Sequence, residues 1–184
     1  MRKLVSGISV LFVALWLAAP AAAQVESKHR GFWISFGLGG GWNVSQNVGV
    51  AQETKPGGAG FIRLGGTLTQ RLLLGGEAIA WGTEVDGATI GRGNGTVTVM
   101  FYPSVETGVF LKGGVGGSTF TTSFTSGNTT TTTTDNGFGA TAGVGWDVRL
   151  GRNFYLTPTV DFLYQRVTDV SNAIVLITVG ATWH

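Results

Sequence analysis

Charged side chains stand inside segments that are otherwise apolar and rich in glycine. Lys112 occupies the centre of GVFLKGGVGGSTF, the segment that begins at Gly108. A buried charge is tolerated only where an opposite charge pairs with it and hydrogen bonds satisfy it. The same situation recurs at Arg63, Glu77, Asp147 and Asp161. Their chemistry is therefore ion pairing away from water, and it requires structural elements that hold the charges there.

Residues suited to catalysis are scarce. The chain has no cysteine, which excludes disulfides, thiolate metal sites and cysteine nucleophiles. It has two histidines, His29 and His184, near the two ends of the chain. No spacing of histidine and carboxylate residues predicts a metal site. The glycine runs GLGGG and GGVGG lack the Lys-Ser/Thr ending of a phosphate-binding loop. We therefore expect no catalytic residue, cofactor or metal.

The first residues predict export. MRKLVSGISVLFVALWLAAPAAAQ has a basic start, an apolar run and a small-residue cleavage site, so residues 1–23 are interpreted as a cleaved signal peptide and residues 24–184 as one domain. An uncleaved membrane anchor is the alternative, and Pro20 with the alanines after it favours cleavage. Cleavage removes Arg2 and Lys3 from the 12 basic residues and leaves 10 against 10 acidic ones. A neutral chain without a basic patch predicts no nucleic-acid partner.

Apolar residues of the mature chain recur with a period of two, which is the period of a β-strand. From Phe32 to Leu38 every second residue is apolar, and the residues between them and after them are mostly serine or glycine. No run of about 18 apolar residues follows the signal, so no transmembrane helix is predicted. Eight strands are expected, at Gly31–Trp42, Gly60–Thr69, Leu72–Trp81, Thr96–Tyr102, Gly108–Ser118, Phe138–Leu150, Phe154–Arg166 and Ala173–Trp183.

The connections between these strands alternate in length. Short ones are expected at Thr69–Arg71, Pro103–Thr107 and Gly151–Asn153. Longer ones are expected at Asn43–Ala59, Gly82–Gly95, Thr119–Gly137 and Val167–Asn172. This alternation is typical of outer-membrane barrels, whose turns are periplasmic and whose loops are extracellular. The expected fold is all-β: an eight-stranded antiparallel up-and-down transmembrane β-barrel with short periplasmic turns and longer extracellular loops.

The strand pattern places the charges. Each shares its parity with glycine, serine or threonine, opposite a row of apolar residues, and the exceptions are Ile79 and Trp81, which fall on the side of Glu77. Basic residues on the lipid face cost about 2–4 kcal/mol each near the bilayer centre, so the charges are expected to face the lumen. Eight strands enclose a lumen that side chains fill. We expect one ionic network that plugs it, and separate charges in contact with water are the alternative. Its members are Arg63, Glu77, Lys112, Asp147 and Asp161, joined by Arg149.

Aromatic residues are expected at both rims of the barrel, as in the aromatic girdles of this class. Trp42 falls at the extracellular rim, and Trp146, Phe154 and Trp183 fall at the periplasmic rim. Pro158 lies inside a strand and has no N–H for the ladder, which predicts a bulge or weak pairing there.

The mature chain resembles small Gram-negative outer-membrane β-barrel proteins of the OmpA/OmpX-like class. The resemblance is carried by RLLLGGEA, VFLKGGVGGS, GVGWDVRLGRNFYLTPTVDFLY and the terminal ITVGATWH. It implies a bacterial outer-membrane location, contact with outer-membrane lipid and lipopolysaccharide, and handling by periplasmic chaperones and the barrel-assembly machinery. The assembly signal would include Val179, Ala181 and Trp183, although His184 rather than an aromatic residue is last.

The resemblance also bears on function. Barrel enzymes of this class use serine with histidine in the outer leaflet, whereas both histidines here are expected at the periplasmic end. The leading expectation is therefore a non-catalytic barrel that serves envelope structure or surface interaction. A narrow porin-like channel for ions or small solutes is the alternative, and a soluble periplasmic barrel is a third possibility. The threonine-rich segment around Thr119–Gly137 is expected to be a flexible solvated loop, with binding of a surface ligand as the alternative.

Overall fold

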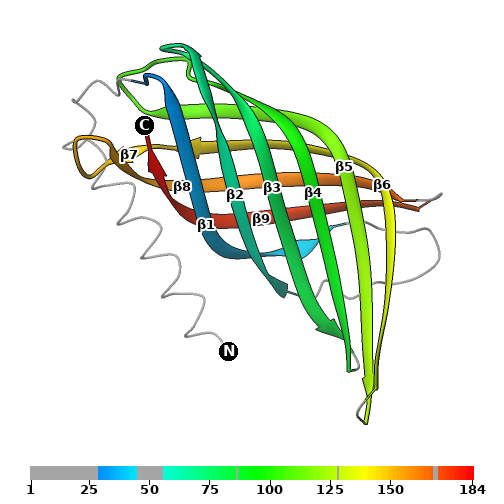
Figure 1. Cartoon of the computed structure of the whole chain (residues 1–184). Helices are drawn as coiled ribbons and strands as arrows, with labels where there is room; N and C mark the ends of the chain where they lie inside the picture. Colours follow the sequence, from blue (N-terminus) through cyan, green and yellow to red (C-terminus); the bar gives the residue numbers. More distant parts are fainter. Residues whose placement is uncertain (1–28, 45–55, 86, 128, 168–169) are drawn as a thin grey trace.

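The computed structural model describes residues 29–44, 56–85, 87–127, 129–167 and 170–184 (Figure 1). The expected signal peptide, residues 1–23, lies outside the described residues, as does most of the expected loop Asn43–Ala59. Among the described residues, no helix is long and apolar enough to cross a membrane.

The described residues form nine antiparallel strands. Their bounds are β1 Phe32–Asn43, β2 Pro56–Thr69, β3 Leu72–Val85, β4 Ala88–Phe101, β5 Val109–Ser126, β6 Thr129–Trp146, β7 Val148–Arg149, β8 Phe154–Val167 and β9 Val170–Trp183.

These strands close into a ring (Figure 1). Neighbours along the chain pair with each other, β1 pairs with β9, and β6 pairs with β8. The two-residue β7 continues β6 beyond Asp147 and also pairs with β8, so the nine strands act as an eight-stranded barrel. The expected all-β, antiparallel up-and-down barrel is confirmed.

Side chains alternate between the lumen and the outer face along each strand. In β4 the side chain of Val97 is 65% exposed and that of its neighbour Thr98 is 1% exposed. An apolar outer face is what a membrane-spanning barrel presents to lipid. Exposed apolar residues are found on every long strand and include Phe32, Leu38, Leu64, Leu74, Val97, Leu111, Val144, Val160 and Val179.

The extracellular ends differ from the expectation. Gly82–Gly95 and Thr119–Gly137 were expected to be loops, but strand pairing runs through almost all of both segments. β5 and β6 continue to Ser126 and Thr129 and form the hairpin that extends farthest at the lower right of Figure 1. Polar composition favours a loop, but threonine is β-branched and suits a paired strand. The expected loop Val167–Asn172 is also shorter, because β8 ends at Val167 and β9 begins at Val170.

Side-chain hydrogen bonds tie this hairpin together. Hydroxyl groups face each other across β5 and β6, and cross-strand pairs of this kind stabilise a sheet. The pairs are Thr121–Thr134 at 3.3 Å, Ser123–Thr132 at 3.0 Å and Thr125–Thr130 at 3.1 Å.

The predicted irregularity at Pro158 is present. The β6–β8 ladder stops at Gly145↔Thr159 and resumes between β7 and β8 at Val148↔Leu156. Proline has no N–H to donate across this gap. Asp147 is opposite the gap, and its backbone N–H donates instead to the carbonyl of Gly108 at 2.9 Å. The break thus frees Asp147 from the ladder on the β8 side.

Candidate functional site

Four of the six charges expected in the lumen meet there. Arg63 of β2 pairs with Glu77 of β3 and with Asp161 of β8, where Nη2 lies 2.7 Å from Oδ2. Lys112 of β5 pairs with the same two carboxylates, and its Nζ lies 3.0 Å from Oδ1 of Asp161. All four side chains are at most 1% exposed. This set, the ionic quartet, alternates two cations with two anions and is neutral overall.

Strand register explains how the ionic quartet forms. Arg63 is directly opposite Glu77 in the β2–β3 ladder. Lys112 is opposite Gly143, and Gly143 is opposite Asp161 on its other side. Because glycine has no side chain, Lys112 reaches over β6 to Asp161. A Cβ at Gly143 would meet Oδ1 of Asp161 and would lie 3.0 Å from Cε of Lys112.

Apolar side chains cover the ionic quartet on both sides along the barrel axis. On the extracellular side, Phe61 and Ile79 are two residues beyond Arg63 and Glu77, and the guanidinium of Arg63 lies 3.7 Å from the centre of the Phe61 ring. This upper cluster contains Phe61, Ile79, Trp81, Leu163, Ile174 and Leu176. The lower cluster, toward the periplasmic turns, contains Trp33, Leu73, Met100, Tyr102 and Phe110. The charges are therefore held in a buried layer between two apolar clusters.

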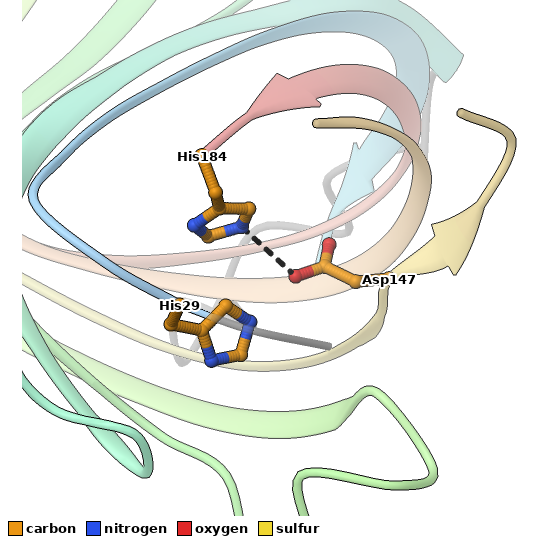
Figure 2. Close-up of side chains that lie close together, drawn as sticks. All are labelled: His29, Asp147 and His184. Atoms are coloured by element: carbon orange, nitrogen blue, oxygen red, sulfur yellow. Dashed lines mark ion pairs between the residues drawn. The ribbon is translucent and has the colours of Figure 1, made fainter. Parts of the chain in front are cut away.

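Asp147 does not join the ionic quartet, although it was expected there. It lies at the end of β6, in a separate group at the short-turn end of the barrel (Figure 2). Tyr102 Oη donates to its Oδ2 at 2.7 Å, and Thr157 Oγ1 donates to its Oδ1 at 2.6 Å. His184 Nε2 lies 3.6 Å from Oδ2. Asp147 is four residues nearer the short-turn end than Gly143, which is opposite Asp161, and this distance along the strand explains the placement.

Arg149 lies in β7, on the far side of the same break. Its Nε donates to the carbonyl of Gly151 at 2.9 Å and its Nη2 to that of Arg152 at 3.0 Å. These hydrogen bonds stabilise the turn between β7 and β8. Arg149 is therefore not a member of the ionic quartet.

Both histidines reach the group around Asp147. The rings of His29 and His184 have centroids 4.4 Å apart, and the ring of His29 lies 4.1 Å from that of Tyr102. Burial lowers the pKa of His29, against the raising effect of its hydrogen bond to the Gln70 carbonyl, so its imidazole is neutral at pH 7. Burial and the nearby carboxylate of Asp147 raise the pKa of the Tyr102 hydroxyl well above its usual value, so it remains a donor.

Sequence reasoning missed this arrangement of His29, Tyr102, Asp147 and His184. No local spacing indicates it, because barrel closure alone brings the start of β1 beside the end of β9. A signal did exist: both histidines were expected at the periplasmic end, and Asp147 follows directly after Trp146 at the rim. Combining those two expectations would have placed the three side chains together.

The expected rim aromatics occupy both ends of the outer wall. Trp42 is at the extracellular end of β1 and is 38% exposed. At the other end, the rings of Phe154 and Trp183 have centroids 4.8 Å apart. Trp146 Nε1 donates to the carbonyl of Thr107 at 2.7 Å, which ties this rim to the turn between β4 and β5.

Comparison with known proteins identifies the family. Residues 10–182 match the Outer membrane protein beta-barrel domain, and the chain belongs to this family of bacterial outer-membrane proteins. A comparison with curated protein sequences gives no match.

Solved structures share the fold. Ail, the attachment invasion locus protein of Yersinia pestis, aligns with a TM-score of 0.62 at 14% identity over 84% of this chain and 99% of that one. Neisserial surface protein A aligns with a TM-score of 0.59 at 14% identity over 83% of this chain and 96% of that one. The N-terminal barrel domain of Pseudomonas aeruginosa OprF aligns with a TM-score of 0.50 at 11% identity over 85% and 100%. These likenesses show a common barrel fold in the bacterial outer membrane.

Proposed function

We propose that the protein is a non-catalytic integral outer-membrane barrel whose lumen is plugged by side chains, and that it acts through its outer surface in envelope structure or surface interaction. The observation that carries the proposal is the ionic quartet. Its four charges neutralise each other, are almost completely buried, and lie between two apolar clusters. Eight strands enclose a lumen that side chains can fill, and the number of large side chains buried here supports a closed barrel rather than an open pore.

The β5–β6 hairpin is the surface that the proposal assigns to interaction. Between Thr119 and Gly137 it carries a single charged residue, Asp135, and many hydroxyl groups. Such a surface suits hydrogen bonding to a neutral polar partner better than electrostatic capture of a polyanion. A structure of Ail is recorded in complex with the heparin analogue sucrose octasulfate. For the present chain the low charge of the hairpin favours a different ligand.

The closing strand is proposed as the assembly signal. Val179 and Trp183 are 50% and 39% exposed on the outer face of β9, with Ala181 between them in the same row. The barrel-assembly machinery and periplasmic chaperones would meet this row before β9 pairs with β1. Outer-membrane lipid and lipopolysaccharide would contact it afterwards.

Conductance across a planar bilayer tests the plugged lumen. We expect the purified protein to insert without a steady open-channel current. Lys112→Met removes a cation from the ionic quartet and is expected to raise the leak or to destabilise the barrel. A steady current through the parent protein would overturn the plug and support the narrow channel for ions or small solutes.

A further inference from the structure

Three segments that are distant in the sequence meet at the short-turn end of the barrel (Figure 2). His29 comes shortly before β1, Asp147 separates β6 from β7, and His184 follows β9. We propose that these three side chains bind one Zn²⁺ ion and that this ion fastens the seam where β1 closes onto β9. This inference goes beyond the proposed plug, because it concerns a different layer of the lumen.

The spacing of the three ligand atoms suits a single ion. One atom from each side chain lies within 4.8 Å of the other two, and His184 Nε2 is 3.6 Å from Asp147 Oδ2. A tetrahedral zinc ion with bonds of about 2.0–2.1 Å holds its ligand atoms about 3.3 Å apart. The separation of His184 Nε2 and Asp147 Oδ2 is already close to that value, and the ligand atom of His29 lies within 4.8 Å of the other two.

A hydrogen bond at Nδ1 of His29 leaves the lone pair on Nε2 of the same ring. Its Nδ1 is 3.0 Å from the carbonyl oxygen of Gln70, and because a carbonyl only accepts, Nδ1 carries the proton. The free lone pair is then on Nε2, which is buried and has no hydrogen-bond partner within the described part of the chain. The side chain as a whole is 1% exposed. A buried ring nitrogen without a partner is costly, and a metal ion would satisfy it.

His184 has the same unsatisfied character. Neither of its ring nitrogens makes a hydrogen bond among the described residues, and its side chain is 2% exposed. Two buried imidazoles therefore lie beside one carboxylate, and each keeps at least one ring nitrogen without a hydrogen bond among the described residues. Ordinary packing of polar side chains seldom leaves two such nitrogens next to each other.

Two hydrogen bonds orient the carboxylate of Asp147. Thr157 donates to Oδ1 of Asp147, and Tyr102 donates to Oδ2. Supporting hydrogen bonds of this kind orient metal-binding carboxylates and histidines in known sites. The Gln70 carbonyl does the same for His29. His29 and Asp147 thus each have a hydrogen-bond partner that fixes the orientation of the side chain.

The donor set indicates the metal. Two imidazole nitrogens with one carboxylate oxygen are typical zinc ligands, and the fourth position is left for water. Mg²⁺ prefers six oxygen ligands and is expected not to bind. Bound zinc would connect residues next to β1, β6 and β9, so it would stabilise the folded barrel by an amount that rises with the logarithm of the free zinc concentration above the Kd.

Calorimetric titration of the purified, detergent-solubilised protein with ZnCl₂ tests the site. We expect saturable binding of one Zn²⁺ per chain, no binding of Mg²⁺, and a rise in the unfolding temperature with zinc. His29→Gln, His184→Gln and Asp147→Asn should each weaken binding at least about tenfold, and Tyr102→Phe about tenfold through the orientation of Asp147. Asp135→Asn, in the remote hairpin, is the matched control and should bind like the parent.

Co²⁺ gives a second readout that does not depend on stability, since a tetrahedral site with nitrogen and oxygen ligands produces visible absorption that Zn²⁺ displaces. The inference is overturned if the folded parent binds no Zn²⁺. It is also overturned if any of the three ligand variants keeps the parent affinity, or if Asp135→Asn loses binding as they do. Folding of each variant is checked by circular dichroism, so loss of the barrel is not mistaken for loss of the site.

Discussion

Lys112 and Asp161 lie on β5 and β8, two strands that are separated in the ring by β6, and their side chains meet over a glycine. Lys112 Nζ is 3.0 Å from Asp161 Oδ1, and Gly143 is opposite both residues in the two ladders. The contact depends on a missing side chain as much as on the two charges. The same relationship explains why a lysine stands in an apolar, glycine-rich segment: glycines leave the volume that its chain needs, and carboxylates on β3 and β8 neutralise it.

Removal of one cation should destabilise the barrel. Lys112→Met leaves Glu77 and Asp161 sharing only Arg63, so the buried layer gains one uncompensated negative charge. Breaking a buried ion pair in this way costs about 3–5 kcal/mol. The free energy of unfolding is measured by urea titration in lipid vesicles, with tryptophan fluorescence as the signal.

The paired variant Lys112→Met with Asp161→Asn is the control for this prediction. It removes one charge of each sign and leaves the Arg63–Glu77 pair intact. We expect the double variant to lose less than the sum of the two single variants, with a coupling of about 0.5–3 kcal/mol. Simple additivity would show that the two charges do not interact.

A side chain at Gly143 should also destabilise the protein. In Gly143→Ala the new Cβ meets Asp161 Oδ1 and lies 2.9 Å from the carbonyl oxygen of Val160. Overfilling of this kind costs about 1–3 kcal/mol. Gly113→Ala, in the adjacent strand, is the matched control, because nothing lies within 4 Å of its Cβ and the position is on the outer face. Equal stability of the two variants would contradict the tight fit at Gly143.

The sequence predicted the architecture well because one rule governs it. A strand has a period of two, and a barrel in lipid has one apolar face, so parity alone indicates which side each residue occupies. On that basis Arg63, Glu77, Lys112 and Asp161 were all expected inside. Ile79 and Trp81, which share the parity of Glu77, looked like exceptions, yet both pack in the upper apolar cluster.

The parity of a residue does not indicate its position along the barrel axis or its contacts across the lumen. The prediction failed for these two properties. Asp147 has the expected parity but lies in another layer, because it is four residues nearer the short-turn end than Gly143, the residue opposite Asp161. The histidine group depends on contacts between the two ends of the chain, which no local spacing indicates and which follow only from combining the expected periplasmic positions of several strand ends. The hairpins were missed for a different reason: runs of glycine, serine and threonine satisfy the composition of a loop and the geometry of a strand equally well.

Labelling from the lipid phase should distinguish the two faces of one strand. The chain has no cysteine, so a single introduced cysteine reports its own position. Val97 is 65% exposed and its neighbour Thr98 is 1% exposed. We expect a lipid-soluble thiol reagent to modify Val97→Cys quickly and Thr98→Cys at least about tenfold more slowly, because only the former contacts lipid. Measured by mass spectrometry, equal rates or the reverse order would contradict the orientation of the barrel wall.

Amide hydrogen exchange should show that the threonine-rich segment is an ordered hairpin. Backbone ladders protect amides, so residues 121–126 and 129–134 should exchange much more slowly than a solvated loop. Thr132 is opposite Ser123, and their hydroxyl oxygens are 3.0 Å apart. Thr132→Pro removes a backbone donor and is expected to accelerate exchange throughout the hairpin while the barrel strands remain protected.

Thr132→Val is the matched control: it keeps the β-branched shape, loses only the hydroxyl hydrogen bond, and should lower the local stability of the hairpin by about 0.5–1.5 kcal/mol. Fast exchange across the whole segment in the parent protein would instead support the flexible loop that its composition suggests.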